Sequence, residues 1–259
     1  MFITHFDSNY FRWGKILLQS HKLNYPNGLI YVSGVNLSET QVKELKSINQ
    51  NAIIDNELIN LKSIPITKTR DRGGGTTGHN LPEYMACRKS WVLQTAFEKF
   101  PNENCYIMTD ADIFINRRYD FEHNIENYDG CFLLGGDPGQ SGQGLHTQVM
   151  SGLIVLKNNQ ASKKLVDRWV FHIKNNNRIQ NWKQWEWFWD QITLNLSLEE
   201  VLKEDYSLFK IPHRYFVNTE MSEDAFMWSP HTGGEERKER MYHLWNNVIK
   251  EVLNGEVDE

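Results

Sequence analysis

The sequence predicts an α/β fold: a mostly parallel central sheet with helices on both faces, in a single domain spanning residues 1–259. Short apolar stretches typical of buried strands alternate with longer stretches in which apolar residues recur at helical spacing. This alternation is typical of a parallel sheet covered by helices. The chain is 40% hydrophobic over 259 residues, which is enough to build a sizeable core.

The first sixty residues show the alternation most clearly. Ser38 precedes a helical pattern and Gln41 follows it three residues later, which is the spacing of a capping box at a helix start. The predicted elements are a strand at 2–5, a helix at 10–20, a strand at 28–33, a helix from 38 and a strand at 52–54.

The rest of the chain continues the pattern around two glycine-rich loops. Glycine loses more conformational freedom than other residues in a helix or strand, so the glycine runs within residues 70–80 and 135–144 predict loops. The predicted strands are 105–109, 130–134 and 151–156, and the predicted helices are 82–100, 162–174, 187–203 and 235–253.

Composition narrows the class of protein and its compartment. The net charge is -5 and no long basic run occurs, which argues against nucleic acid as a partner. The three cysteines, Cys87, Cys105 and Cys131, form no C-x-x-C pair, so we expect neither a disulfide framework nor a cysteine zinc site. We find no signal-peptide pattern and no apolar stretch of spanning length, so we expect no membrane span and a cytoplasmic location.

The strongest functional signal is Asp110-Ala111-Asp112, directly after the predicted strand 105–109. Ligands of α/β sheets bind beyond the carboxyl ends of strands, and residues two apart in an extended chain lie on one side. Asp110 and Asp112 can therefore hold one Mn²⁺ or Mg²⁺ ion, since hard cations prefer carboxylate oxygens. The alternative is a pair of solvated turn aspartates.

The segment around these aspartates resembles a known family. The run YIMTDADIFINRR, residues 106–118, is similar to the DxD segment of GT-A glycosyltransferases, and closest to the nucleotide-diphospho-sugar transferase and glycogenin-like groups. Three further segments resemble that family in the same order: the opening strand with Asn9-Tyr10 and its helix, SGLIVLKNN at Ser151–Asn159, and Trp189-Asp190-Gln191 with Asn195.

The resemblance implies a metal-dependent enzyme that transfers a sugar from a nucleotide-diphosphate sugar to a hydroxyl of a glycan, a protein or a small acceptor. Residues 1–112 would form the nucleotide-binding half, and residues 113–259 the acceptor-side half with a C-terminal helix. The expected donor is a UDP-sugar, with a GDP-sugar next, and the expected cofactor is Mn²⁺ or Mg²⁺. A retaining outcome is favoured by analogy alone. Oligomeric state is not predicted.

The first strand tip would contact the nucleoside of the donor. By resemblance, Thr4 and His5 lie at this tip, Asp7 accepts a hydrogen bond from the base or ribose, and Tyr10 stacks. The alternative for Asp7 is an ordinary helix cap.

Basic residues would face the diphosphate. Arg88 and Lys89 precede the acidic motif on a helix, and Arg72 lies in a glycine-rich loop that could close over the donor. Near the C-terminus, Gly234 and Lys238 fit the family's late glycine and basic residue. The alternative for Arg88 and Lys89 is a solvated helix face, and the alternative for the loop with Arg72 is a disordered loop.

His231 is expected to be the third metal ligand, because an imidazole can complete a shell that already holds two carboxylates. His243 is the rival candidate, although it lies within a helix among apolar neighbours. The alternative for His231 is an ordinary loop histidine.

By resemblance, the reacting sugar would lie over Ser151 and Gly152, beside Asp190 and Gln191. Asp190 could bind donor hydroxyls, or act as a base if the enzyme inverts; the alternative is a helix salt bridge. For the acceptor we expect Asp137, in a glycine-rich loop, and Trp187. The tryptophans that share the opposite helical face are more typical of a core: Trp182, Trp185 and Trp189.

Two other function classes remain open. A magnesium-dependent phosphate-ester hydrolase or nucleotidyltransferase of α/β fold also needs acidic residues at a strand tip, but its usual motif position lies near the start of the domain. A non-catalytic sugar-binding module would explain the tryptophans but leaves the acidic motif without a role.

Overall fold

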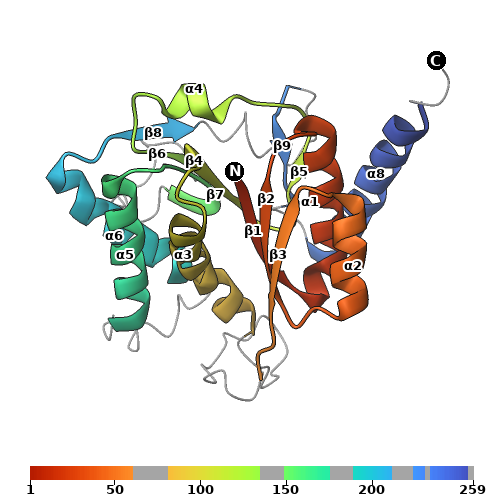
Figure 1. The fold of residues 1–259 in the computed structure, drawn as a ribbon, viewed down its shortest axis with the longest axis horizontal. Helices are drawn as coiled ribbons and strands as arrows, with labels where there is room; N and C mark the ends of the chain where they lie inside the picture. The colour runs from red at the N-terminus through yellow and green to blue at the C-terminus, as the bar shows by residue number, and fades with distance from the viewer. Residues whose placement is uncertain (61–80, 135–148, 176–188, 212–223, 231–233, 256–259) are drawn as a thin grey trace.

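The structure is a computed structural model that describes residues 1–60, 81–134, 149–175, 189–211, 224–230 and 234–255 (Figure 1). Its centre is a sheet of strand order β3-β2-β1-β4-β7-β6-β8, in which β7 is antiparallel to both neighbours and the other pairs are parallel. The mostly parallel sheet predicted from the sequence is thus confirmed. The strands are β1 Phe2–Asp7, β2 Ile30–Val35, β3 Ala52–Glu57, β4 Cys105–Thr109, β6 Gly130–Leu134, β7 Val149–Lys157 and β8 Leu208–Ile211.

Helices cover both faces of the sheet, each over its own apolar cluster. One face packs against α1 (Phe11–Asn24), α2 (Glu39–Ile48) and α4 (Phe121–Ile125). The other packs against α3 (Leu81–Lys99), α5 (Gln160–Asn175) and α6 (Trp189–Val201), which stand together in Figure 1. Alternation along a strand supplies both clusters: in β1, Phe2 and Phe6 face the first and Ile3 faces the second.

A smaller two-stranded sheet attaches the C-terminal helix to the body. It pairs β5 (Phe114–Ile115) with β9 (Met227–Trp228), and its aromatic side chains pack between α1 and α8 (Gly234–Gly255). Phe114 stacks on Trp228 with ring centroids 5.1 Å apart. Because β5 follows the acidic motif, this packing brings the start of α8 near that motif.

The predicted elements are confirmed, with shifted ends in most cases. The strands at 105–109 and 130–134 match in full, and the capping box between Ser38 and Gln41 is formed. The sequence analysis missed β5, α4, β8 and β9, and 3-10 helices at Ser8–Tyr10 and Leu202–Glu204 flank α1 and α6. The two predicted glycine-rich loops lie outside the described residues.

The three cysteines are buried and form no disulfide. Burial raises the pKa of the Cys105 thiol to about 11 and that of the Cys131 thiol to about 12. These thiols are therefore protonated at neutral pH and unreactive. In the part of the chain that the structure describes, no helix has the length and apolar character needed to cross a bilayer.

Two buried histidines should make the fold sensitive to acid. Burial lowers the pKa of His5 and of His21 to about 4, from 6.5. As pH falls below 6.5, these histidines become protonated in the unfolded chain, whereas in the folded chain they stay neutral until about pH 4. The free energy of unfolding should therefore drop between pH 6.5 and pH 4, by roughly 3 kcal/mol per histidine. The free energy of unfolding, measured by denaturant titration at several pH values in this range, should depend less steeply on pH in His21→Phe than in the parent. An unchanged pH dependence of the free energy of unfolding in His21→Phe would refute the assignment.

Candidate active site

Polar side chains gather at one edge of the central sheet. The carboxyl ends of the parallel strands β1 and β4 lie at this edge, which is where α/β sheets bind ligands. The reversed strand β7 begins here: the Asp110 amide donates to the Gly152 carbonyl at 3.1 Å. The reversal thus brings Ser151 and Gly152, from the start of a strand, beside Asp110 at the end of another.

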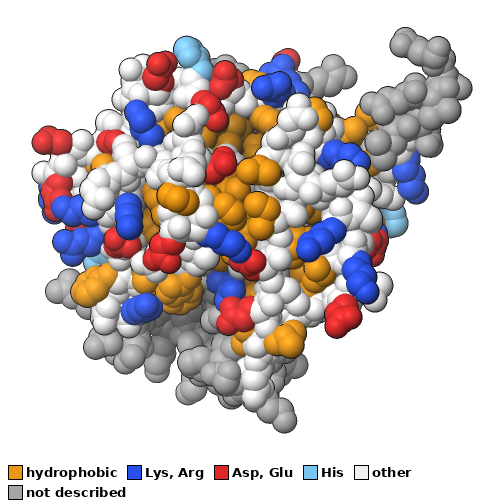
Figure 2. Space-filling view, viewed as in Figure 1, with side chains coloured by type: hydrophobic (Ala, Val, Ile, Leu, Met, Phe, Trp, Pro, Cys, Tyr) orange, Lys and Arg blue, Asp and Glu red, His pale blue; other side chains and the backbone are white. Residues whose placement is uncertain are grey.

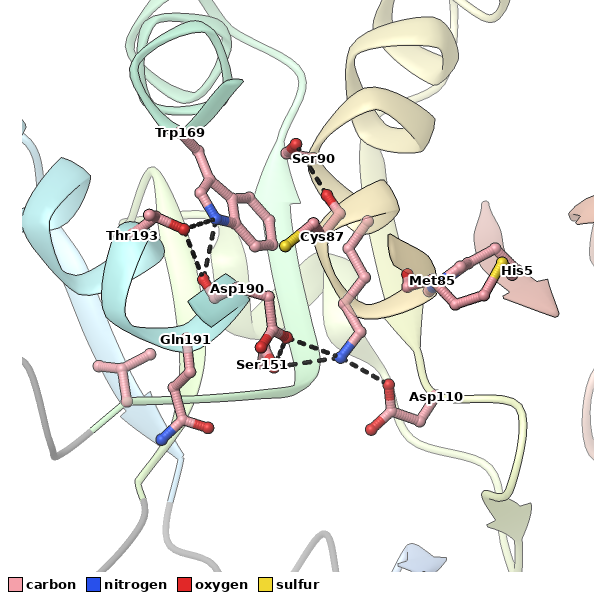
Figure 3. Close-up of polar contacts among 12 residues, drawn as sticks. His5, Met85, Cys87, Ser90, Asp110, Ser151, Trp169, Asp190, Gln191 and Thr193 are labelled. Carbon is pink, nitrogen blue, oxygen red and sulfur yellow. Dashed lines mark hydrogen bonds and ion pairs between the residues drawn. The ribbon is translucent and has the colours of Figure 1, made fainter. Parts of the chain in front are cut away.

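Lys89 joins the two acidic groups of this edge. Its ammonium lies 2.7 Å from Asp110 Oδ1 and 3.3 Å from Asp190 Oδ2, and it donates to Ser151 Oγ at 3.1 Å (Figure 3). Ser151 Oγ in turn donates to Asp190 Oδ2 at 2.5 Å. Residues from α3, β7, the end of β4 and the start of α6 therefore meet at one cation. We call Lys89, Asp110, Ser151 and Asp190 the lysine cluster.

The lysine cluster is charged although it is buried. Lys89 is 5% exposed and Asp190 4%. Burial alone lowers the pKa of Lys89, but Asp110 and Asp190 outweigh it and raise that pKa above its ordinary value. Lys89 therefore stays protonated at neutral pH and offsets the negative charge of both acids.

Gly152 leaves room for Asp110. A β-carbon at this position would lie 3.2 Å from Asp110 Oδ2, closer than ordinary van der Waals contact. The missing side chain therefore lets this carboxylate lie against β7. In Figure 3 the Asp110 oxygen that Lys89 does not contact points away from the buried cluster, in the direction in which the Gln191 amide also extends.

Gly152→Ala should displace the Asp110 carboxylate without unfolding the protein. If Asp110 is a ligand of Mn²⁺, as the sequence predicts, Mn²⁺ affinity should fall about tenfold, as when a residue that supports a metal ligand is replaced. The free energy of unfolding should fall by no more than about 3 kcal/mol. Calorimetric titration with Mn²⁺ and a denaturant titration measure the two effects. An alanine variant with parent Mn²⁺ affinity would show that this contact does not matter for the site.

Lys238 and Tyr10 lie beside the second aspartate of the motif. Lys238 Nζ is 3.9 Å from Asp112 Oδ2 and 5.8 Å from the centre of the Tyr10 ring. Burial raises the pKa of Tyr10 despite the opposing effect of Lys238. The Tyr10 side chain is 40% exposed, an accessible aromatic face beside Asp112. Lys238 and Tyr10 therefore lie close to Asp112, and their predicted contacts with a donor stay predictions.

The side chains at the end of β1 have mainly internal contacts. Asp7 caps the following 3-10 helix by accepting from the amides of Asn9 and Tyr10 at 2.9 and 3.1 Å, which is the alternative considered for it. Thr4 is fully buried and donates to the Thr109 carbonyl at 3.1 Å. His5 Nε2 lies 2.6 Å from the Met85 carbonyl, and its Nδ1 has no hydrogen-bond partner among the described residues.

The two predicted basic residues of α3 point in different directions. Lys89 enters the lysine cluster, whereas Arg88 pairs with Glu57 at 2.5 Å and contacts Ser33 at 3.4 Å. Arg88 lines a groove of about 660 Å³ over β2, β3 and α3 together with Trp91. Figure 2 shows Lys and Arg side chains beside Asp and Glu side chains on this face.

The start of α6 is fixed by buried hydrogen bonds that the sequence analysis did not predict. The Trp169 indole nitrogen donates to the Asp190 carbonyl at 2.9 Å. Asn195 donates to the carbonyls of Gln191 and Val149 at 2.7 and 3.2 Å. Asn195 was marked only by resemblance, and Trp169 carried no signal beyond the apolar spacing of its helix.

A divalent ion fits the residues of this edge. The side chains of Asp110 and Asp112 keep 29% and 20% exposure, and their oxygens suit Mn²⁺ or Mg²⁺. Within the described ranges no three His, Cys, Asp or Glu side chains group as a metal site, and His231, the predicted third ligand, lies outside them. His243, the rival, is exposed on α8.

Gly234 is the first residue of α8. The other predicted residues outside the described ranges are Arg72, Asp137 and Trp187.

Comparisons with known proteins identify the fold. No protein-family model matches the chain, and a search of curated proteins found no match. Among solved structures, the galactosyltransferase LgtC, in complex with donor and acceptor sugar analogs, is similar with a TM-score of 0.61 at 11% identity, over 96% of this chain and 95% of LgtC.

Two further glycosyltransferases are similar over most of this chain. One is involved in the glycosylation of the major capsid of PBCV-1, with a TM-score of 0.54 at 15% identity, over 93% of this chain and 97% of that one. The other is GlyE of Streptococcus pneumoniae TIGR4, with a TM-score of 0.55 at 13% identity, over 99% of this chain and 63% of GlyE. The fold predicted from the sequence, that of GT-A glycosyltransferases, is confirmed.

Proposed function

We propose that this protein is a metal-dependent glycosyltransferase that moves a sugar from a nucleotide-diphosphate sugar to an acceptor hydroxyl. The observation that carries the proposal is the lysine cluster, in which a buried ammonium joins Asp110 of the acidic motif to Asp190 at the start of α6. The glycosyltransferase fold supports it at the level of reaction class. A fold can host several chemistries, so the argument rests on the site.

The acidic motif would hold the donor diphosphate. Asp110 and Asp112 would be ligands of Mn²⁺ or Mg²⁺, with His231 as a third, and a bound ion would supply positive charge that stabilises the leaving nucleoside diphosphate. Lys238, already beside Asp112, would pair with a phosphate oxygen. The exposed Tyr10 ring is suited to stack on a base, and we favour UDP over GDP as the nucleotide.

The residues at the start of α6 would orient the donor sugar. Asp190 Oδ2 is held by Ser151 and Lys89, whereas no hydrogen bond to Oδ1 occurs among the described residues. Asp190 Oδ1 is thus suited to accept a hydrogen bond from a sugar hydroxyl. A similar solved structure is an active-site mutant of LgtC with glutamine replaced by glutamate, and by analogy we propose that Gln191 also contacts the donor sugar.

The acceptor class and the stereochemical outcome are proposed from the similar solved structures and from the sequence resemblance. LgtC was solved with an acceptor sugar analog, and the other enzyme is involved in the glycosylation of the major capsid of PBCV-1, so a glycan or protein hydroxyl is the proposed acceptor class. Retention of configuration is proposed from the resemblance of the segment at Asp190 and Gln191. The anomeric configuration of the product, read by NMR, tests it.

The donor assay tests the proposed function. The protein is incubated with UDP- and GDP-sugars in Mn²⁺, with and without a chelator, and released nucleoside diphosphate is measured. We expect release from at least one donor, loss of release with the chelator, and loss in Asp110→Ala and Asp112→Ala. Release of inorganic phosphate from simple phosphoesters, with no turnover of any nucleotide sugar, would instead favour the hydrolase class.

A further inference from the structure

The first turn of α6 is held from outside by the indole of Trp169, a residue of α5. Trp169 Nε1 donates to the Asp190 carbonyl at 2.9 Å and lies 3.1 Å from Thr193 Oγ1 (Figure 3). The Thr193 hydroxyl donates to the same carbonyl at 3.1 Å. One backbone oxygen of the candidate site therefore accepts two side-chain hydrogen bonds.

These bonds lie in a buried environment. Trp169 is 1% exposed, Thr193 is fully buried and Asp190 is 4% exposed. Away from water a hydrogen bond is stronger, and a polar group that loses its partner costs more. The indole therefore restrains the start of α6 more firmly than apolar packing alone.

Asp190 is thus fixed at two points. Its carbonyl is bound on the α5 side by Trp169, and its carboxylate is bound on the sheet side by Ser151 and Lys89. Rotation of the first turn about the helix axis would break one set of bonds or the other. Gln191, the next residue, turns with the same segment.

We infer that Trp169 is a positioning residue, whose indole N–H sets the rotation of the first turn of α6 and so the aim of Asp190 and Gln191. The inference rests on the proposed function, because it concerns the geometry of the reacting sugar. Trp169 itself touches no substrate in this scheme. Its effect is therefore expected on the rate of the chemical step more than on donor binding, which Asp110 and Lys238 would dominate.

The chain offers a matched control for this inference. Trp245 is also fully buried, but its indole nitrogen has no hydrogen-bond partner among the described residues. Trp169→Phe and Trp245→Phe thus remove the same atoms from a similar degree of burial, and only the first removes a hydrogen bond to Asp190. Thr193→Val removes the second donor to the same carbonyl and keeps both indoles, although it also removes the hydroxyl that the Trp169 indole contacts at 3.1 Å.

The experiment compares kcat and donor KM for the parent and the three variants, with melting temperatures measured in parallel. We expect Trp169→Phe to lower kcat roughly 10- to 100-fold, since small misplacements cost up to about two orders of magnitude, with donor KM changed less than about threefold. Thr193→Val should lower kcat in the same direction, and Trp245→Phe should keep kcat within about twofold.

Equal kcat in Trp169→Phe and Trp245→Phe, with an active parent, would overturn the positioning role and leave the proposed function standing. A parent protein that releases no nucleotide from any donor would overturn both. A loss in Trp169→Phe seen only as a raised KM would also count against the inference.

Discussion

Lys89→Met is expected to destabilise the protein strongly and to abolish turnover. Lys89 is the buried counter-charge of Asp110 and Asp190, and methionine keeps much of its volume while removing the charge. Breaking a buried ion pair by removing one partner costs about 3–5 kcal/mol, because the remaining charge stays buried and unpaired. Denaturant titration measures the loss, and Lys163→Met, on the exposed side of α5, should change stability by less than about 0.5 kcal/mol.

A second substitution separates the charge effect from a packing effect. In Lys89→Met combined with Asp190→Asn, the more deeply buried unpaired carboxylate is replaced by a neutral amide. Part of the lost stability should therefore return, although activity should not. If the double variant is no more stable than Lys89→Met, the cost arises from packing and the electrostatic account of the lysine cluster is wrong.

Asp110→Asn is expected to lower kcat at least about 1000-fold, equivalent to roughly 4 kcal/mol of barrier. The change keeps the shape of the side chain but removes the charge of the proposed metal ligand. Asp110 is partly exposed and Lys89 keeps Asp190 as a partner, so the fold should persist. Calorimetric titration should show that Mn²⁺ binding is lost together with donor turnover.

Asp167→Asn serves as the control, because this exposed aspartate of α5 contacts Gln94 and lies outside the lysine cluster. It should bind Mn²⁺ and turn over donor as the parent does. A kcat equal to that of the parent in Asp110→Asn would show that the acidic motif takes no part in the reaction.

The sequence predicted the sheet and its motif better than the geometry around them. Strands such as Cys105–Thr109 are continuous apolar runs with clear ends, so their bounds could be read directly. The two-residue strands β5 and β9 are too short for any periodicity and form only because distant segments meet. The direction of β7 depends on which neighbours it pairs with, which local pattern does not encode.

The candidate site was predicted by residue type and only partly by role. The pair Arg88 and Lys89 could not be separated from sequence, since their directions depend on how α3 rotates over the sheet. Asp7 caps a 3-10 helix and the buried Thr4 donates to a neighbouring strand, so a polar residue at the end of a strand can have a purely structural role. The partners of Asp190 come from three distant elements, so their meeting could not be derived from spacing.

The burial of all three native thiols makes the protein convenient for site-selective labelling. Asn102 is exposed in the turn between α3 and β4. This turn lies at the amino end of β4, whereas Asp110 follows the carboxyl end of the same strand. A maleimide dye on Asn102→Cys would thus be the single label on the folded chain, far from the proposed donor site. Such a probe could report conformational change during turnover by fluorescence, with the native protein as an unlabelled blank.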